Sequence, residues 1–85
     1  MENKPPAITR QTARHVLWIF GYTQGLQPGN FSAKLLDAMA FAPSSQLDLL
    51  GRGYPEEVAA IRLAKYDENG IAQLQAIATG GEVAA

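Results

Sequence analysis

The stretch GYTQGLQPGNFSAKLL, residues 21–36, decides between two fold classes. Evenly spaced glycines before a helix start raise the question of a phosphate-binding loop, which would place the chain among the α/β nucleotide enzymes. The P-loop pattern is G-x-x-x-x-G-K-[ST] after a buried strand, so that backbone N–H groups and a lysine face the phosphates. Here Gly25 and Gly29 are one residue too close, Asn30 replaces the lysine, and a helical pattern precedes the loop. The stretch therefore predicts a turn between two helices and an all-α fold.

The residues of this turn explain how one helix ends and the next begins. Gly21 and Gly25 allow the first helix to end, and Pro28 presets the backbone of the second. We expect Gln27 or Asn30 to cap the free N–H groups at the start of the second helix. A helix N-terminus attracts anions, but the turn is favoured here over an anion site.

Apolar residues at helical spacing predict a helix on either side of the turn. The first helix follows Thr9 as its N-cap and runs to about Tyr22. The second begins near residues 28–30 and ends before Pro43. The expected inward residues are Ala13, Val16, Leu17 and Phe20 in the first helix, and Phe31, Leu35, Ala38, Met39 and Ala42 in the second, with Leu36 at the edge.

Three more helices are predicted to follow. After the sequence APSS, Ser45 is expected to cap a third helix that GRG at residues 51–53 ends. Pro55 suits the first position of a fourth helix. DENG at residues 67–70 ends that helix, with Gly70 able to take the left-handed conformation. A last short helix follows, which Gly80 and Gly81 end. The residues expected to face inward are Leu47, Leu50, Val58, Ile61, Ala64 or Lys65, Ile71, Leu74 and Ile77.

These signals predict an all-α protein, a compact bundle of four to five short helices. The chain has 85 residues, which allow one core, and it lacks the alternation typical of strands. We expect a single helical domain over residues 1–85, with residues 1–8 and 79–85 flexible.

The composition predicts a cytoplasmic protein without membrane contact. There is no cysteine, so disulfides and thiolate metal sites are excluded. The longest run of large apolar residues, 16–20, is far shorter than the roughly 20 residues that span a bilayer. The start MENKPPAITR lacks the layout of a signal peptide.

The charge argues against a general nucleic-acid binder, because the net charge is −1 and such domains usually carry a basic surplus. Residues 1–45 carry four basic and two acidic side chains, whereas residues 46–85 carry three basic and six acidic ones. This asymmetry is typical of solvated helix faces. Head-to-tail association or an acidic docking face is the alternative.

No group of residues in the sequence indicates catalysis, a metal or a cofactor. His15 is the only histidine, so no histidine pair can bind zinc, and no spacing selects a serine–histidine–aspartate triad. The carboxylates of Glu56 and Glu57, and of Asp67 and Glu68, are neighbours in sequence that do not face each other on a helix. We therefore predict a non-enzymatic protein with no cofactor and no metal.

The second and third predicted helices allow one alternative function, a small helix–turn–helix DNA-binding regulator. A recognition helix needs donors aimed at base edges and basic flanks for the phosphates. The segment SSQLDLLGRG, residues 44–53, offers Gln46 and Arg52 but also Asp48. Nucleic acid is therefore the less favoured partner.

The first predicted helix is apolar on two sides, which makes it the most informative segment for function. At about 100° per residue, its core stripe leaves a second set of large side chains on the opposite half, where a peripheral helix normally carries charges. The predicted partner-binding residues are Arg14, His15, Trp18, Ile19 and Tyr22.

Two interpretations of this second side remain open. In one, the first helix is the central helix of the bundle and is covered on all sides. In the other, Trp18, Ile19 and Tyr22 form an exposed patch, and Arg14 lies at its rim over the Trp18 ring. Tryptophan, tyrosine and arginine are the residues that dominate interface energetics.

Three motifs carry a resemblance to a known group. P-G-x-F opens the second helix, G-[FY]-P-E-x-V-A-A opens the fourth, and G-I-x-x-L-x-x-I opens the last. The matching residues are Pro28, Gly29, Phe31, Leu35, Leu36, Leu50, Gly53, Tyr54, Pro55, Glu56, Val58, Ala59, Ala60, Gly70, Ile71, Leu74 and Ile77. Over roughly residues 15–78 the chain resembles small uncharacterised helical proteins of actinobacteria and actinobacteriophages. The linker departs from that pattern, because Pro43, Ser44 and Ser45 stand where an acidic residue is common.

The resemblance implies a phage or prophage setting and assigns no activity. The aromatic side of the first helix predicts a small non-enzymatic protein-interaction module, and the resemblance implies that the module is phage-encoded. Its expected partner is a host or phage protein, or a second copy of the chain. The helix–turn–helix regulator is the alternative.

Overall fold

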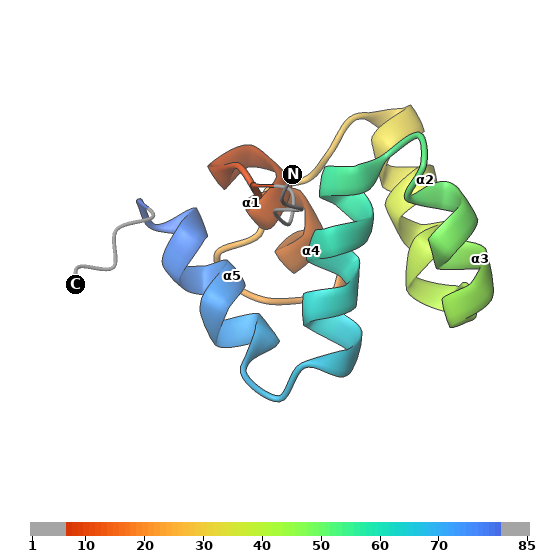
Figure 1. The fold of residues 1–85 in the computed structure, drawn as a ribbon. Coiled ribbons are helices and arrows are strands. Elements are labelled where there is room, and N and C mark those ends of the chain that lie inside the picture. The colour runs from red at the N-terminus through yellow and green to blue at the C-terminus, as the bar shows by residue number, and fades with distance from the viewer. Residues whose placement is uncertain (1–6, 81–85) are drawn as a thin grey trace.

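Helices make up most of the chain that the structure describes. The computed structural model describes residues 7–80, and within them five helices and no strand occur. The helices are α1 (Arg10–Ile19), α2 (Asn30–Phe41), α3 (Ser44–Leu50), α4 (Pro55–Tyr66) and α5 (Gly70–Ala78) (Figure 1). None of these helices has the length and the apolar composition needed to cross a membrane. The predicted all-α bundle of short helices is confirmed.

The other helices pack around α4. It contacts all four of them, and α1 packs against α5 and α2 as well. In Figure 1, α4 runs through the middle of the molecule, with α5 on one side and with α2 and α3 on the other. Helix α1 exposes Arg14 and Trp18, so the interpretation that the first helix is the central one, covered on all sides, is wrong.

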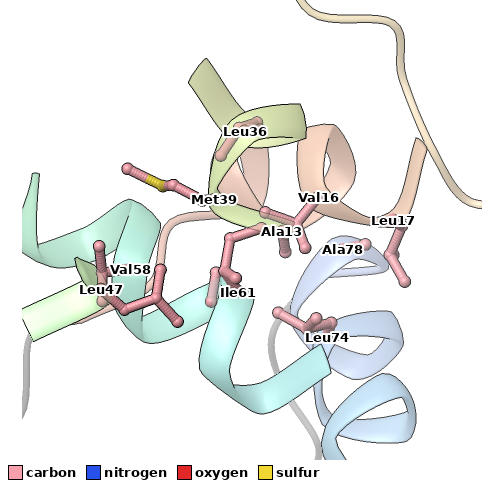
Figure 2. Close-up of a cluster of buried hydrophobic side chains, with 11 residues drawn as sticks. Ala13, Val16, Leu17, Leu36, Met39, Leu47, Val58, Ile61, Leu74 and Ala78 are labelled. Atoms are coloured by element: carbon pink, nitrogen blue, oxygen red, sulfur yellow. The ribbon is translucent and has the colours of Figure 1, made fainter. Parts of the chain in front are cut away.

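Each helix contributes apolar side chains to one core. The buried residues are Ala13, Val16, Leu17, Leu36, Met39, Leu47, Val58, Ala60, Ile61, Leu74 and Ala78 (Figure 2). Among residues 7–80 no polar or charged side chain is buried. Apolar burial is therefore the main force that holds the helices together.

Helix α1 begins and ends with recognisable local signals. Thr9 is its N-cap, as predicted, and the Thr9 hydroxyl accepts a hydrogen bond from the Thr12 N–H. At the other end, the N–H of Gly21 donates to the Trp18 carbonyl and the N–H of Tyr22 donates to the Leu17 carbonyl. This is the Schellman motif, which needs the left-handed φ of +84° at Gly21. The helix therefore ends at Ile19 rather than near Tyr22.

The inward face of α2 differs from the predicted one. Leu36 and Met39 are buried, whereas Phe31 and Ala38, which were expected to face inward, are exposed. The buried stripe is rotated by about 90° around the helix axis toward Leu36. Since α2 has apolar residues on both sides, helical periodicity alone did not select the side that packs.

The starts of α2 and α3 have no side-chain caps. Gly29 and Pro43 occupy the two N-cap positions, and neither provides a side-chain hydrogen bond. The predicted capping residues, which the structure does not use in this way, are Gln27, Asn30 and Ser45.

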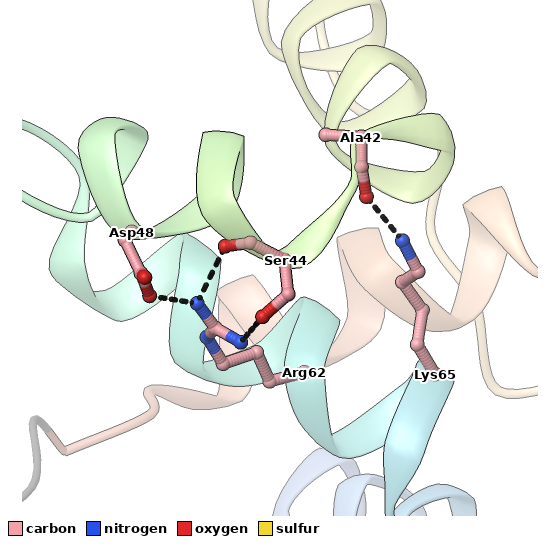
Figure 3. Close-up of polar contacts among 5 residues, drawn as sticks. All are labelled: Ala42, Ser44, Asp48, Arg62 and Lys65. Carbon is pink, nitrogen blue, oxygen red and sulfur yellow. Dashed lines mark hydrogen bonds and ion pairs between the residues drawn. The ribbon is translucent and has the colours of Figure 1, made fainter.

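Two basic residues of α4 hold the corner between α2 and α3 instead (Figure 3). The guanidinium of Arg62 donates to the hydroxyl of Ser44 at 3.0 Å and to its carbonyl at 3.3 Å, and it forms an ion pair with Asp48. The ammonium of Lys65 donates to the carbonyl of Ala42 at 2.7 Å, which satisfies the C-terminus of α2. The position of α3 therefore depends on α4 rather than on a cap of its own.

Gly70 does not have the predicted left-handed conformation. It is the first residue of α5, it is buried, and it is not among the glycines with positive φ. A Cβ atom at this position would lie 1.7 Å from the carbonyl oxygen of Leu63. Glycine is therefore required because α4 and α5 approach each other closely, and not because the turn needs a special backbone angle.

The expected flexible ends, residues 1–8 and 79–85, lie largely outside the described residues. Of the residues at the ends that the structure does describe, Ile8 packs against the core. The Thr79 hydroxyl donates to the carbonyl of Gln75 at 3.1 Å.

Candidate protein-interaction surface

Arg14, Trp18 and Tyr22 follow one another at four-residue spacing along the outer side of α1 and the turn after it. All three are exposed, and the exposed fraction is 41% for Trp18 and 42% for Tyr22. Val16 and Leu17 of the same helix are completely buried. Helix α1 thus has one apolar side in the core and a second apolar side that reaches solvent.

The other two predicted partner-binding residues lie deeper than this exposed stripe. Ile19 is partly buried and packs against the core. His15 is also partly buried, and desolvation by burial lowers the pKa of His15 below its ordinary value, so the imidazole is neutral at pH 7. The structure therefore places His15 and Ile19 at the border of the exposed stripe and not within it.

The loop between α1 and α2 folds back over α1 and adds an aliphatic residue to the outer side. The N–H of Leu26 donates to the carbonyl of Arg14 at 3.0 Å. A Cβ atom at Gly25 would lie 2.4 Å from the Cα of Trp18, so only glycine allows the loop this close to the helix. Leu26 is 46% exposed and thus lies beside Arg14 at the surface. We call Arg14, Trp18, Tyr22 and Leu26 the α1 surface.

The same loop is also attached to α5 and to the protein interior. The side-chain amide of Gln75 donates to the Oε1 atom of Gln24 at 3.0 Å, and Pro28 is buried. Sequence analysis did not identify Leu26, because helical periodicity says nothing about a loop that returns along its helix. The closely spaced glycines were a signal that the loop approaches another segment.

The expected stacking of Arg14 on Trp18 is not formed. Within residues 7–80 the cation–π contact is that of the Lys65 ammonium, 5.2 Å from the centre of the Tyr66 ring. Arg14 makes no ion pair with any residue in that range. Its guanidinium therefore lies at the rim of the α1 surface without an acidic neighbour from the described chain.

The surroundings of the α1 surface lack negative charge. No aspartate or glutamate occurs from Ala7 to Leu36, and α5 has no charged residue. The acidic side chain that reaches α1 is Glu56, whose Oε2 atom lies 2.7 Å from both the N–H and the hydroxyl of Thr9. Arg14 is thus the charged residue of the α1 surface, and Glu56 makes its contacts at the opposite end of the helix, with Thr9.

The described residues contain no other arrangement that indicates chemistry. Between residues 7 and 80 no three histidine, cysteine, aspartate or glutamate side chains are grouped to hold a metal. Two open grooves flank α4: one of about 570 Å³ beside Ile8 and Tyr66, and one of about 410 Å³ between α3 and α4. Arg62 borders both, but no histidine, serine, threonine or cysteine lines either groove. Neither groove therefore offers a serine, threonine or cysteine nucleophile with a histidine base.

Helix α3 does not have the features of a DNA recognition helix. It has seven residues, it packs against α4, and it exposes the carboxylate of Asp48 near its middle. A carboxylate at this position repels phosphates, and Arg62, which pairs with it, is already engaged. No observation in the structure favours the regulator.

No protein-family model, no curated protein sequence and no solved structure matches this chain. The candidate function therefore depends on the geometry and charge of the α1 surface.

Proposed function

We propose that this protein is a non-enzymatic interaction module that binds a protein partner through the α1 surface. The observation that supports the proposal is the exposure of Arg14, Trp18, Tyr22 and Leu26 on one side of α1 and its returning loop. Tryptophan, tyrosine and arginine contribute most of the energy in protein interfaces. Exposed apolar patches on small soluble proteins usually mark an interaction site.

Several backbone contacts hold the loop of the α1 surface against its helix. The Schellman motif at Gly21, the close contact at Gly25 and the bond from Leu26 to Arg14 hold the loop against the helix. An ordered surface loses less conformational entropy on binding than a mobile loop does. The α1 surface is thus suited to a stable, specific contact.

Charge defines the chemistry of the partner. Because Arg14 has no acidic neighbour within the described chain, we propose a partner that presents apolar side chains bordered by aspartate or glutamate. The resemblance to actinobacterial and actinobacteriophage proteins suggests a host or phage protein as the source of that segment.

A random-peptide display selection on the full chain tests this proposal. We expect enriched peptides that combine acidic residues with aromatic or aliphatic ones. Trp18 is the only tryptophan, so its fluorescence emission should shift to shorter wavelength when such a peptide binds. The double variant Trp18→Ala, Tyr22→Ala should weaken peptide binding by about 100-fold or more, because it removes two interface anchors.

Two further variants make the result specific. Tyr66→Ala removes an aromatic side chain that is also exposed but lies at the end of α4, so peptide affinity should be unchanged. Arg14→Glu should lower the affinity for acidic peptides by about tenfold and reduce its dependence on salt. Circular dichroism confirms that each variant is folded. Enrichment of basic peptides, or binding that survives the double variant, would contradict the proposal.

A further inference from the structure

The most exposed large apolar side chains lie on α2 and not on the α1 surface. Phe41 is 82% exposed and Phe31 is 66% exposed. The ring of Tyr54 lies 6.5 Å from that of Phe31 and adds a second aromatic ring beside it. Helix α2 packs against α4 and α1 with its opposite side and lies at the edge of the bundle (Figure 1). Nothing in the described chain covers these rings.

The exposed residues of α2 have the spacing of a helix-pairing seam. Phe31, Lys34, Ala38 and Phe41 are separated by three, four and three residues, and all but the lysine are apolar. This is the alternation of a and d positions in a coiled coil, and it confines the four side chains to an arc of about 80°. We call these four residues the α2 outer face. The buried Leu36 and Met39 lie on the other side of the helix.

We infer that the α2 outer face pairs with the same face of a second copy in an antiparallel homodimer. A twofold axis midway between Lys34 and Ala38 places Phe31 of one copy against Phe41 of the other, at both ends of the interface. It also places the aliphatic stem of Lys34 over the small Ala38 of the second copy. Phe31 and Phe41 of each copy are then removed from water, which supplies the driving force.

Charge complementarity supports this partner and this orientation. Asp37 lies at the flank of the α2 outer face, and neither Lys34 nor Asp37 forms an ion pair within the described residues. In the antiparallel arrangement the ammonium of Lys34 reaches Asp37 of the second copy, and the symmetry repeats this pair. A parallel arrangement would instead bring the two Lys34 side chains together, and like charges in a seam are unfavourable.

The length of α2 limits the strength of the dimer. A helix of 12 residues is about 18 Å long, so the contact is smaller than the roughly 800 Å² per partner of a standard stable interface. We therefore expect a reversible dimer with a dissociation constant on the order of 10–100 μM. This inference does not depend on the α1 surface, which lies on another helix.

Sedimentation velocity of the full chain between about 5 and 500 μM tests the dimer. The mass should rise from 9.1 kDa toward twice that value. Phe41→Ala should weaken association at least tenfold, whereas Arg14→Glu, on the α1 surface, should leave it unchanged. A monomer at every concentration, or a dimer that Phe41→Ala does not affect, would overturn the inference. A dimer that Arg14→Glu abolishes would show that the copies meet through the α1 surface.

A charge exchange tests the predicted contacts between the copies. Lys34→Glu places a carboxylate beside Asp37 of the second copy, and Asp37→Lys places two ammonium groups together, so each single variant should associate at least tenfold more weakly. The double variant Lys34→Glu, Asp37→Lys restores the pair with reversed signs and should recover association to within about threefold of the wild type. Failure of this recovery would contradict the proposed charge pairing.

Cysteine cross-linking distinguishes the two orientations, because the chain has no cysteine of its own. Phe31→Cys and Phe41→Cys proteins, mixed and mildly oxidised, should form the mixed disulfide in preference to either homodimer. Preferred cross-linking between two copies of Phe31→Cys would show a parallel pair and would overturn the antiparallel arrangement. Circular dichroism before oxidation verifies that both variants are folded.

Discussion

The outer sides of α1 and α2 both expose aromatic rings, but the protein supports these rings differently. On α1 a returning loop presses Gly25 against the backbone of Trp18, and more than half of the Trp18 side chain remains covered. On α2 no loop returns over the helix, and Phe41 is 82% exposed. The α1 surface, which a loop supports, suits a different protein as its partner. The α2 outer face, a stripe along one helix, suits the same stripe of a second copy.

Both α1 and α2 pack against α4. A substitution that disturbs the packing of α5 against α4 should therefore affect the two helices differently. Gly70→Ala is expected to have the largest effect, because its Cβ would lie 1.7 Å from the carbonyl oxygen of Leu63 and would push α5 away from α4. We expect a loss of about 3 kcal/mol or more in the free energy of unfolding. Since α1 packs against α5 and α2 does not, hydrogen exchange should increase in α1 before it increases in α2.

The control for this prediction is Gly53→Ala. A Cβ at Gly53 meets no atom within 4 Å, and its φ is not positive, so stability should change by less than about 0.5 kcal/mol. If Gly70→Ala were as stable as the control, or if α2 lost protection together with α1, the close packing of α4 and α5 would not be the support that we describe.

A second pair of substitutions compares the two sides of α2 directly. Leu36→Ala empties a buried position and should cost about 3 kcal/mol. Phe41→Ala removes a larger side chain from an exposed position of the same helix and should change stability by less than about 0.5 kcal/mol. Chemical denaturation at a few micromolar protein, where the proposed dimer is dissociated, measures both values. Equal losses would mean that α2 faces the core with the side that contains Phe41.

The orientation of α2 shows where sequence information ends. The starts of α1 and α4 were predicted correctly, because Thr9 as a cap and Pro55 at the first position act within one helical turn. For α2 the sequence offers two apolar stripes, and the stripe with Phe31 contains the larger side chains. The structure buries Leu36 and Met39 instead, because α2 must fit against α4 and α1, and that fit is not encoded in the period of a single helix.

Contacts between distant segments were the other part that the sequence did not reveal. A glycine in a sequence indicates a turn or a close approach without showing which of the two applies. Gly70 was assigned to a turn, but its neighbour is Leu63 of the preceding helix. Leu26 joins the α1 surface because its N–H bonds back to Arg14, which periodicity cannot indicate. The second apolar side of α1 was visible in the sequence, but the sequence left open whether other helices cover it; the structure shows Trp18 and Tyr22 exposed.

The smallest predicted effect separates α1 from α2 by pH. The Glu56 carboxylate accepts hydrogen bonds from Thr9 at the N-terminus of α1. At the C-terminus of α2, the acceptor for Lys65 is the backbone carbonyl of Ala42, and a backbone carbonyl does not titrate. Burial acts to raise the pKa of Glu56, but hydrogen bonds from Thr9 and Thr12 outweigh it, so the pKa lies below its ordinary value of 4.5. Acid should therefore loosen α1 before α2.

The sign of this effect follows from the lowered pKa. The folded state favours the ionised carboxylate of Glu56, so its contribution to stability is fully present above the ordinary value of 4.5 and is lost as the pH falls through the lowered value. The contribution should be less than about 1 kcal/mol, because the site is close to solvent. Glu56→Gln should thus be less stable than the wild type at pH 7, and the two denaturation curves should converge in acid. Glu57→Gln removes the same charge without touching Thr9 and should show no such convergence. A difference in stability between wild type and Glu56→Gln that persists unchanged in acid would mean that Glu56 stabilises α1 by packing. The N-terminus of α1 and the C-terminus of α2 would then respond to pH alike.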